Sequence, residues 1–218
     1  MIITDIVEMS KNKVEVCVDD EIRFALYKNE LRTFGITKDG ELSRETYDTI
    51  MGEVLLKRAK LRCMNLLKGR DYTKHQLVTK LKQGRYPEEV IDAAVAYVCS
   101  YGYVDDLRYA RSYMEHAGQS KSRRQIEQNL VRKGVSAEII KQACEECMEE
   151  DSIAEEEELI QKLLEKRHFD KRNATYKECQ KLVGFLYRKG FCLDKIYRAV
   201  GICADSAGCE QGQTSWYD

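Results

Sequence analysis

The sequence has little proline, histidine or tryptophan: its 218 residues include one Pro, three His and one Trp. Average usage would supply about ten prolines, so proline-rich, collagen-like and linker-dominated classes are excluded and long uninterrupted helices are allowed. An excess of charge of one sign is missing as well, since 36 basic side chains stand against 37 acidic ones. The charged fraction of 33% suits thin, well-solvated helices better than a broad buried sheet. The length allows one or two domains that fold without disulfides.

Long hydrophobic runs are also missing. The longest stretch without a charged residue covers 93–104, and it is well short of the ~20 apolar residues that a membrane-spanning helix needs. We therefore predict no membrane association, and because the N-terminal MIITDIVEMSK has no basic leader before an apolar core, we expect no secretory signal. Nine cysteines are scattered from Cys17 to Cys209, and this odd number indicates a cytoplasmic protein with mostly buried thiols.

The first fifty residues differ from the rest of the chain. Apolar side chains alternate on both sides of a short acidic turn, at Val14, Val16 and Val18 before it and at Ile22, Phe24 and Leu26 after it. Period two on both sides of a turn predicts a β-hairpin with one buried face, and residues 2–7 could add a third strand. A lone hairpin is marginally stable, so we expect residues 1–52, the hairpin module with a linking helix, to pack on the helices that follow.

From about Ser43 onward helical periodicity replaces the strand pattern. Ser43 is a candidate N-cap, and Thr73 with Gln76 forms a candidate capping box. Pro87 stands where a further helix would begin. The predicted fold class is therefore mainly all-α, with a small N-terminal β-hairpin module.

A repeat organises the helical part. An apolar pair four residues apart, followed ten residues later by a third apolar residue, occurs three times, at Leu77, Leu81 and Ile91, at Ile126, Leu130 and Ile140, and at Leu182, Leu186 and Ile196. Each copy has a glycine in the gap, Gly84, Gly134 or Gly190, and we expect it to supply the left-handed residue that ends a helix. We predict tandem three-helix repeats in an elongated array, with limits at 53–104, 105–150 and 151–201 and a frayed tail at 202–218.

The charges are segregated along the chain. Residues 57–85 contain ten basic residues and one acid, and residues 142–161 contain nine acids and no base. Basic residues recur at equivalent places in the repeats, which would align them along one edge to track a phosphate backbone or a charged polymer. The candidate partner- or DNA-binding residues are Lys80, Lys82, Arg85, Lys121, Arg123, Arg124, Arg132, Lys133, Arg188 and Lys189. The alternative is that these runs are ordinary solvated helix faces, and the acidic block at 145–158 has two open interpretations, a self-repelling junction or a docking surface.

Motifs of catalysis are absent from the sequence. It has no phosphate-binding loop, dinucleotide fingerprint, zinc-protease helix or nucleophile elbow. His75, His116 and His168 lie far apart, and Cys144 and Cys147 are a single pair where a zinc site needs four ligands. We predict no catalytic residue, no metal and no cofactor. A helix-turn-helix repressor is a weaker alternative because no one helix is distinguished as the recognition helix.

Two segments resemble the RecX regulatory proteins, which modulate the RecA recombinase. The resemblance rests on Gly102-Tyr103-Val104-Asp105-Asp106 followed by Tyr109-Ala110, on Lys121-Ser122-Arg123-Arg124-Gln125-Ile126 with Leu130 and Lys133-Gly134-Val135, and on the three helical copies. It covers about 55–200, and Tyr109 stands where the family often has Phe. The resemblance implies architectural roles for Gly102, Tyr103, Asp105, Asp106, Gly134 and Gly190.

The resemblance also implies a function. Members of the family are non-enzymatic regulators whose curved body lies in the groove of a RecA–DNA filament and mostly inhibits ATP hydrolysis and strand exchange, in recombination, DNA repair and the SOS response. The implied partners are therefore the RecA filament and single- and double-stranded DNA. A general DNA-binding helical protein without RecA dependence is the alternative. We expect a monomer, because each repeat buries its apolar face against its neighbour.

Overall fold

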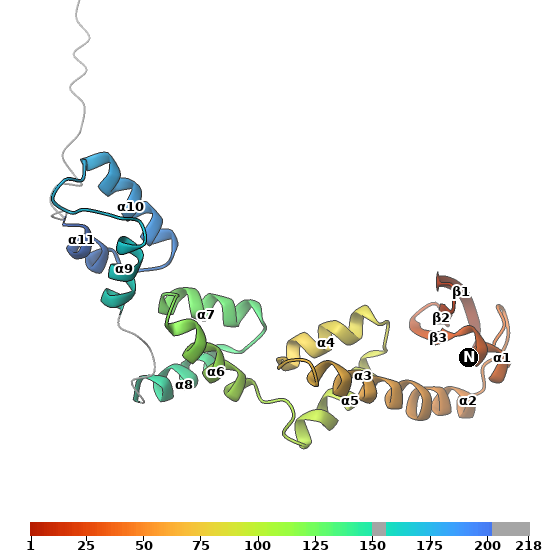
Figure 1. The fold of residues 1–218 in the computed structure, drawn as a ribbon. Helices are drawn as coiled ribbons and strands as arrows, with labels where there is room; N and C mark the ends of the chain where they lie inside the picture. The colour runs from red at the N-terminus through yellow and green to blue at the C-terminus, as the bar shows by residue number, and fades with distance from the viewer. Residues whose placement is uncertain (150–155, 202–218) are drawn as a thin grey trace, which may run out of the picture. The chain divides into compact units, whose positions relative to one another are not determined.

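The computed structural model describes residues 1–149 and 156–201, in two compact units (Figure 1). Unit 1 comprises Met1–Tyr109 together with Lys133–Val135, and unit 2 comprises Ala110–Arg132 and the chain from Ser136. The predicted tail at 202–218 and the middle of the acidic block, 150–155, lie outside the described residues. No described helix is long and apolar enough to span a bilayer.

The N-terminal module is a three-stranded antiparallel sheet in the order β1 (Ile3–Ser10), β2 (Lys13–Val18) and β3 (Ile22–Tyr27). Val16 pairs with Phe24 and Val14 with Leu26, and these four side chains are buried. The predicted hairpin and its third strand are confirmed. The same hydrophobic core includes Leu77 of the helical part, so the sheet packs on the helices as expected.

A short helix, α1 (Lys28–Thr33), follows the sheet, and a continuous helical run then covers Arg44–Leu67. This run consists of α2 (Arg44–Thr49), the π-helical segment η1 (Ile50–Leu55) and α3 (Leu56–Leu67). Ser43 caps it, since its hydroxyl oxygen accepts a hydrogen bond from the Thr46 backbone N–H at 3.1 Å. The π-helical segment was not predicted, because a change from i−4 to i−5 hydrogen bonding leaves no clear trace in apolar periodicity.

Three helical repeats follow. Repeat 1 contains α3, α4 (Lys74–Gln83) and α5 (Glu88–Ser100). Repeat 2 contains α6 (Asp106–Gly118), α7 (Arg123–Arg132) and α8 (Ala137–Glu149). Repeat 3 contains α9 (Glu156–Glu165), α10 (Tyr176–Arg188) and α11 (Leu193–Val200). All nine matched apolar positions are at most 8% exposed, which confirms the repeat and the mainly helical fold class, while the limits of the domains stay a prediction.

The helix-ending turn differs between the repeats. Gly134 and Gly190 have φ of +80° and +83°, as predicted. Gly84 does not supply the left-handed residue, because its φ is −80° and Arg85 takes φ +59° instead. The prediction for Gly84 was therefore wrong by one position: repeat 1 has Gly-Arg where the other repeats have Lys-Gly, and the left-handed conformation stays at the same place in the repeat.

The segment from Gly102 to Asp106 connects the end of α5 with the starts of α4 and α6. Gly102 has φ +69°, and its N–H donates to the Cys99 carbonyl at 2.9 Å, which closes the end of α5. The Asp105 carboxylate accepts the Leu107 N–H at 2.9 Å and so caps α6. The buried Asp106 carboxylate accepts the N–H of Lys74, the first residue of α4, at 2.9 Å. Two neighbouring carboxylates thus hold the starts of two helices.

A hydrogen bond between a helix cap and a turn occurs once in each unit. The Thr73 hydroxyl, the N-cap of α4, donates to the Lys133 carbonyl at 2.6 Å. The Ser122 hydroxyl, which precedes α7, donates in the same way to the Lys189 carbonyl at 2.5 Å. We call this the cap–turn contact, because a Ser or Thr cap meets the Lys carbonyl of a Lys-Gly turn. The Thr175 hydroxyl, the N-cap of α10, donates instead to the Glu178 carboxylate at 2.8 Å.

Replacement of Thr73 by valine tests the cap–turn contact. The variant loses both the cap, whose oxygen accepts the Gln76 N–H, and the bond to the Lys133 carbonyl. We expect a loss of about 2–3 kcal/mol in the free energy of unfolding. Thr175→Val, which loses a cap but no cap–turn contact, should lose about 1 kcal/mol. Urea denaturation followed by circular dichroism measures the free energy of unfolding of both variants. Equal losses in the two variants would show that the cap–turn contact does not stabilise the protein.

Candidate partner-binding surface

The predicted basic residues of repeat 1 lie at the end of α4. Lys80 is half-buried, and Lys82 and Arg85 are exposed. The Lys82 ammonium lies 3.3 Å from the Glu88 carboxylate, and the Arg85 guanidinium lies 3.2 Å from that of Glu15. The Lys82–Glu88 pair is exposed, and exposed ion pairs contribute about 0–1 kcal/mol, so an incoming phosphate can replace Glu88 at low cost. The Glu15 side chain is only 12% exposed, so loss of Arg85 to a phosphate would leave a nearly buried carboxylate without its cation.

The predicted basic residues of repeat 2 lie in α7 and directly beside it. Lys121 donates to the Tyr113 hydroxyl at 3.1 Å. The hydrogen bond from Arg123 to the Glu127 carboxylate, 3.0 Å long, raises the pKa of the guanidinium. Arg124 and Arg132 are exposed.

One face of α7 is hollowed into a shallow cavity of about 500 Å³. Arg124 and Arg132 line it, together with Glu127, Gln128 and the exposed Val131. The two arginines, two helical turns apart, lie on the same side of the helix. This face combines two cations with an apolar centre, which suits a partner that is both acidic and apolar.

The basic side chains of the turns after α7 and α10 lie over aromatic rings. The Lys133 ammonium lies 5.6 Å from the centroid of the Tyr109 ring. The Lys189 ammonium and the Arg167 guanidinium lie 5.3 Å and 3.7 Å from that of Phe185. Arg188 is exposed. Contacts within about 6 Å of a ring centroid are attractive, so the rings hold these side chains in place.

Lys121, Arg123 and Arg124 lie before or at the start of α7. The other predicted residues lie in the last turn of the second helix of each repeat or in the turn that follows it. Cations there also interact favourably with the helix dipole, so part of the pattern is explained by helix stability. The structure brings Lys80, Lys82 and Arg85 together in unit 1, and Arg124 and Arg132 together in unit 2. The alignment of the basic residues of all three repeats along one edge of the molecule stays a prediction.

A second basic group in unit 1 was missed by the sequence analysis. Lys13 of β2 and Arg58 and Arg62 of α3 line a cavity of about 480 Å³. Burial lowers the pKa of the Lys13 ammonium, and the charges of Arg58 and Arg62 lower it further. Lys13 stands outside every basic run of the sequence, so only the packing of the sheet on α3 reveals the group.

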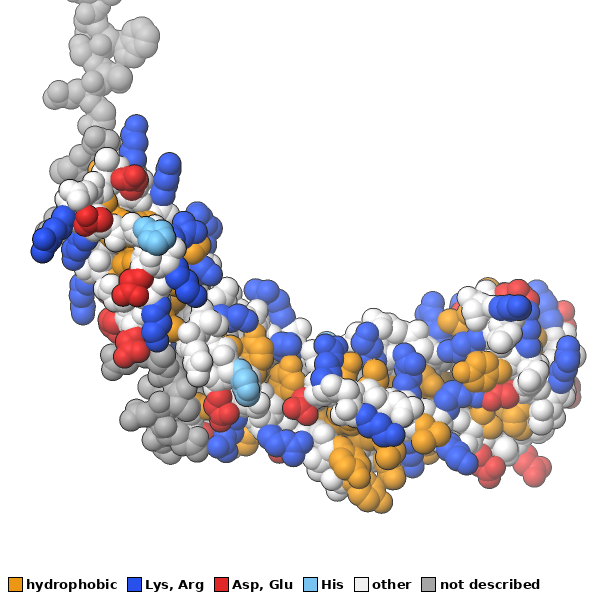
Figure 2. Space-filling model, in the orientation of Figure 1, with side chains coloured by type: hydrophobic (Ala, Val, Ile, Leu, Met, Phe, Trp, Pro, Cys, Tyr) orange, Lys and Arg blue, Asp and Glu red, His pale blue; other side chains and the backbone are white. Residues whose placement is uncertain are grey.

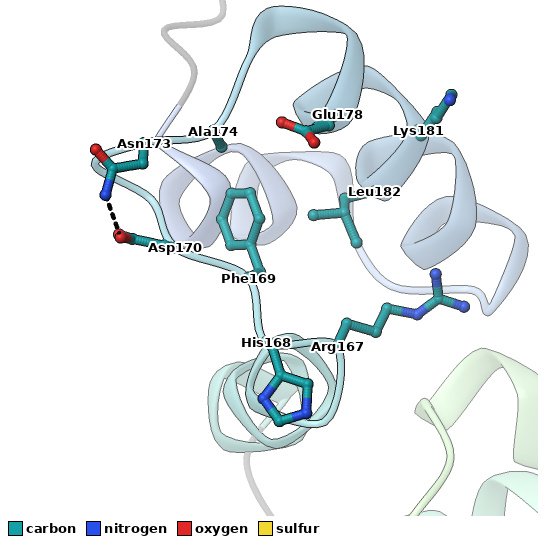
Figure 3. Close-up of a pocket in the computed structure, with 9 residues that line it drawn as sticks. All are labelled: Arg167, His168, Phe169, Asp170, Asn173, Ala174, Glu178, Lys181 and Leu182. Carbon is teal, nitrogen blue, oxygen red and sulfur yellow. Dashed lines mark hydrogen bonds between the residues drawn. The ribbon is translucent and has the colours of Figure 1, made fainter.

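A cavity of about 380 Å³ lies between α10 and the loop that joins α9 to α10 in repeat 3 (Figure 3). Phe169 and Leu182 point into it, and Asn173 donates to the Asp170 carboxylate at 2.7 Å. Its lining mixes both charges and includes His168, Arg167, Lys181 and Glu178. The hydrogen bond between Asn173 and Asp170 lies within the loop and joins an amide to a carboxylate. It therefore does not pair a nucleophile with a general base, as a catalytic site would require.

Five of the seven described cysteines are buried, whereas Cys99 is half-buried and Cys192 is exposed. Cys144 and Cys147 are buried in α8, and burial raises the pKa of the Cys144 thiol. Burial also raises the pKa of Cys63 to about 11. Such thiols are poor nucleophiles and poor metal ligands at neutral pH. Among the described residues, no three His, Cys, Asp or Glu side chains come together as a metal site.

The comparisons with known proteins agree with the repeats. Models of the first, second and third three-helix domains of RecX match residues 59–97, 105–143 and 155–200. The regulatory protein RecX of Caldanaerobacter subterraneus is 33% identical over 93% of this chain and 100% of its own length. That of Clostridium perfringens is 30% identical over 86% of this chain and 89% of its own length.

Solved structures have the same fold. A crystal structure of a regulatory protein RecX matches 92% of this chain and 98% of its own, with a TM-score of 0.59 and 24% identity. The structure of RecX from Lactobacillus salivarius matches 67% of this chain and 95% of its own, with a TM-score of 0.55 and 21% identity. With three domain models in sequence and relatives matched over nearly their whole length, this chain belongs to the RecX family of regulatory proteins.

Proposed function

We propose that this protein regulates the RecA recombinase by binding the RecA–DNA filament, and that it mostly inhibits ATP hydrolysis and strand exchange. Membership of a family of regulatory proteins supports a role in regulation. No residue is assigned to catalysis, and the basic residues at the ends of the second helices are the proposed contacts.

The observation that carries the proposal is the repetition of a basic helix end. Lys82 lies in the last turn of α4 and Arg85 follows the helix. Arg132 ends α7 and Lys133 follows it, and Arg188 ends α10 with Lys189 as its C-cap. A filament presents the same acidic surfaces and phosphates at regular intervals. Three weak contacts on one chain reinforce one another, because after the first has formed the others are intramolecular.

Inhibition requires a difference in affinity between filament states. A regulator that bound the active and inactive states equally would shift nothing, however tightly it bound. We therefore propose that the protein binds more tightly to a filament state that neither hydrolyses ATP rapidly nor exchanges strands. Several contacts to successive subunits would create this preference, since they fit one subunit spacing and not another.

Strand exchange and ATP hydrolysis by RecA, measured at fixed salt with and without the protein, test this proposal. We expect both activities to fall when the protein is added to preformed filaments, at concentrations below those at which it coats free DNA. The DNA-binding alternative predicts DNA affinity without RecA dependence. Inhibition that appears only where the protein saturates naked DNA, measured in parallel by anisotropy, would contradict the RecA proposal.

A further inference from the structure

Three tyrosines form an exposed cluster at the end of α5. The ring centroids of Tyr97 and Tyr101 lie 4.9 Å apart, and those of Tyr101 and Tyr103 lie 6.0 Å apart, with the latter two rings within 13° of parallel. Tyr101 is 61% exposed and Tyr103 is 51% exposed. Figure 2 shows exposed hydrophobic side chains gathered in the region of α5. We call these three rings the tyrosine ladder.

The rings of Tyr101 and Tyr103 are not part of the hydrophobic core, and the backbone of Tyr103 can supply the architectural role expected of this residue. The turn after α5 is closed by backbone groups, since the Gly102 N–H donates to Cys99 and the Tyr103 N–H donates to the Val98 carbonyl at 3.1 Å. Tyr97 packs at the edge of the hydrophobic core, whereas Tyr101 and Tyr103 lie outside it. Large exposed rings are unfavourable for solubility, so a surface that keeps two of them stacked in solvent indicates a partner.

Cations flank the ladder at both ends. The Lys60 ammonium lies 4.3 Å from the centroid of the Tyr97 ring. At the other end the Arg108 guanidinium lies 3.2 Å from the Gly102 carbonyl oxygen, beside Tyr103. The facing helix α3 contains no acidic residue. The nearby charges are thus suited to an anionic partner.

The two acids next to the ladder are already engaged. The Asp105 carboxylate accepts backbone N–H groups at the start of α6, and that of Asp106 accepts the first N–H of α4. A helix N-terminus carries a partial positive charge, which offsets a carboxylate placed on it. The repulsion that these acids exert on a phosphate near Arg108 is therefore reduced.

We propose that the tyrosine ladder is a stacking platform for the bases of a single-stranded nucleic acid, with Lys60 and Arg108 beside its phosphates. Stacking on aromatic rings is independent of base identity, because every base has a flat π face. Nearly parallel, solvent-exposed faces and flanking cations are the two parts that such a site needs. An apolar protein partner would instead find polar neighbours at the rim, namely Ser100, Lys60 and Arg108. The inference concerns nucleic-acid affinity alone and does not depend on RecA.

Fluorescence anisotropy with a labelled oligo(dT) 20-mer and the full-length protein tests the platform. The Tyr101→Ala/Tyr103→Ala variant should bind the oligonucleotide at least ten-fold more weakly, because each lost stacking contact is worth about 1–3 kcal/mol. The Tyr101→Phe/Tyr103→Phe variant keeps both π faces and should bind within about three-fold of the unchanged protein. The bases of a duplex of the same length are already stacked on one another. The alanine variant should therefore lose less affinity for the duplex than for oligo(dT).

A matched control is available on another helix. Tyr176 and Tyr187 of α10 are 50% and 49% exposed, and their double alanine variant should leave oligo(dT) affinity unchanged. Circular dichroism checks that each variant is folded. Unchanged affinity of the ladder alanine variant would overturn the proposal, and so would an equal loss on duplex and single strand. Intact oligo(dT) affinity with weakened binding to RecA would also overturn it, because the ladder would then be a protein-docking surface.

Discussion

Replacement of Gly134 by alanine is expected to lower the free energy of unfolding by about 3–5 kcal/mol, a large effect for the addition of one methyl group. The residue has φ +80°, a conformation that costs any L side chain about 1–2 kcal/mol. The new Cβ would also lie 2.2 Å from both Cβ and Cγ of His75. The His75 Cβ is fixed by the backbone of α4, so one of the two backbones has to move and the bond from Thr73 to the Lys133 carbonyl is strained with it.

Alanine variants of two other glycines separate the effect of the positive φ from the effect of the close approach to His75. Gly102 has φ +69° with nothing within 4 Å of an added Cβ, so Gly102→Ala should cost about 1–2 kcal/mol from φ alone. Gly52 in η1 also has open space and no positive φ, and Gly52→Ala should be neutral or slightly stabilising. Urea denaturation followed by circular dichroism ranks the three variants. If Gly134→Ala loses no more stability than Gly102→Ala, the close approach of the new Cβ to His75 does not destabilise the protein.

Simultaneous reversal of Lys80, Lys82, Arg132 and Lys133 to glutamate is expected to weaken binding to the RecA–DNA filament by about 100-fold at low salt. Each phosphate contact that a protein loses also lowers the slope of log affinity against log salt by about 0.7–0.9. The salt dependence of inhibition should therefore become much flatter. Strand exchange at several salt concentrations measures both quantities. The backbone carbonyl of Lys133 remains in this variant, so the cap–turn contact of Thr73 is retained.

A control variant carries the same change in charge at other exposed positions. Lys11, Arg32, Lys166 and Arg172 are all exposed and lie away from the ends of the second helices. Their reversal to glutamate changes the net charge equally and should leave most of the inhibition intact. If both variants lose inhibition to the same extent, only the overall charge matters. If the first variant inhibits as well as the unchanged protein, the helix ends are not the contact surface.

Much of the fold could be predicted because its signals are local. Alternation of Val14 with Val16 and of Phe24 with Leu26 reflects the two-residue period of a strand with one buried face. The pairs Leu77 with Leu81 and Ile126 with Leu130 reflect one face of a helix. The three-fold recurrence of this spacing identified the repeats without any long-range information.

The features that could not be predicted depend on contacts between distant segments or on backbone detail. Arg85 takes the left-handed conformation although Gly84 is adjacent, because the turn keeps its place relative to the core rather than following the glycine. The acidic partner of Arg85 is Glu15, far away in the sequence, so counting charges along the chain could not identify this ion pair. Lys13 reaches the basic group of α3 only through the packing of the sheet.

The cap of the third repeat differs from the caps of the first two in the partner of its hydroxyl group. Gln76 and Gln125 stand three residues after the caps Thr73 and Ser122, and a neutral amide leaves each hydroxyl proton for a neighbouring carbonyl. The corresponding residue after Thr175 is Glu178, whose carboxylate takes that proton at 2.8 Å. The Glu178 carboxylate therefore keeps the Thr175 hydroxyl proton within the start of its own helix, in a charge-assisted bond about twice as strong as a neutral one. The choice of amide or carboxylate at this position thus distinguishes a cap that binds a distant turn from a cap that binds only its own helix.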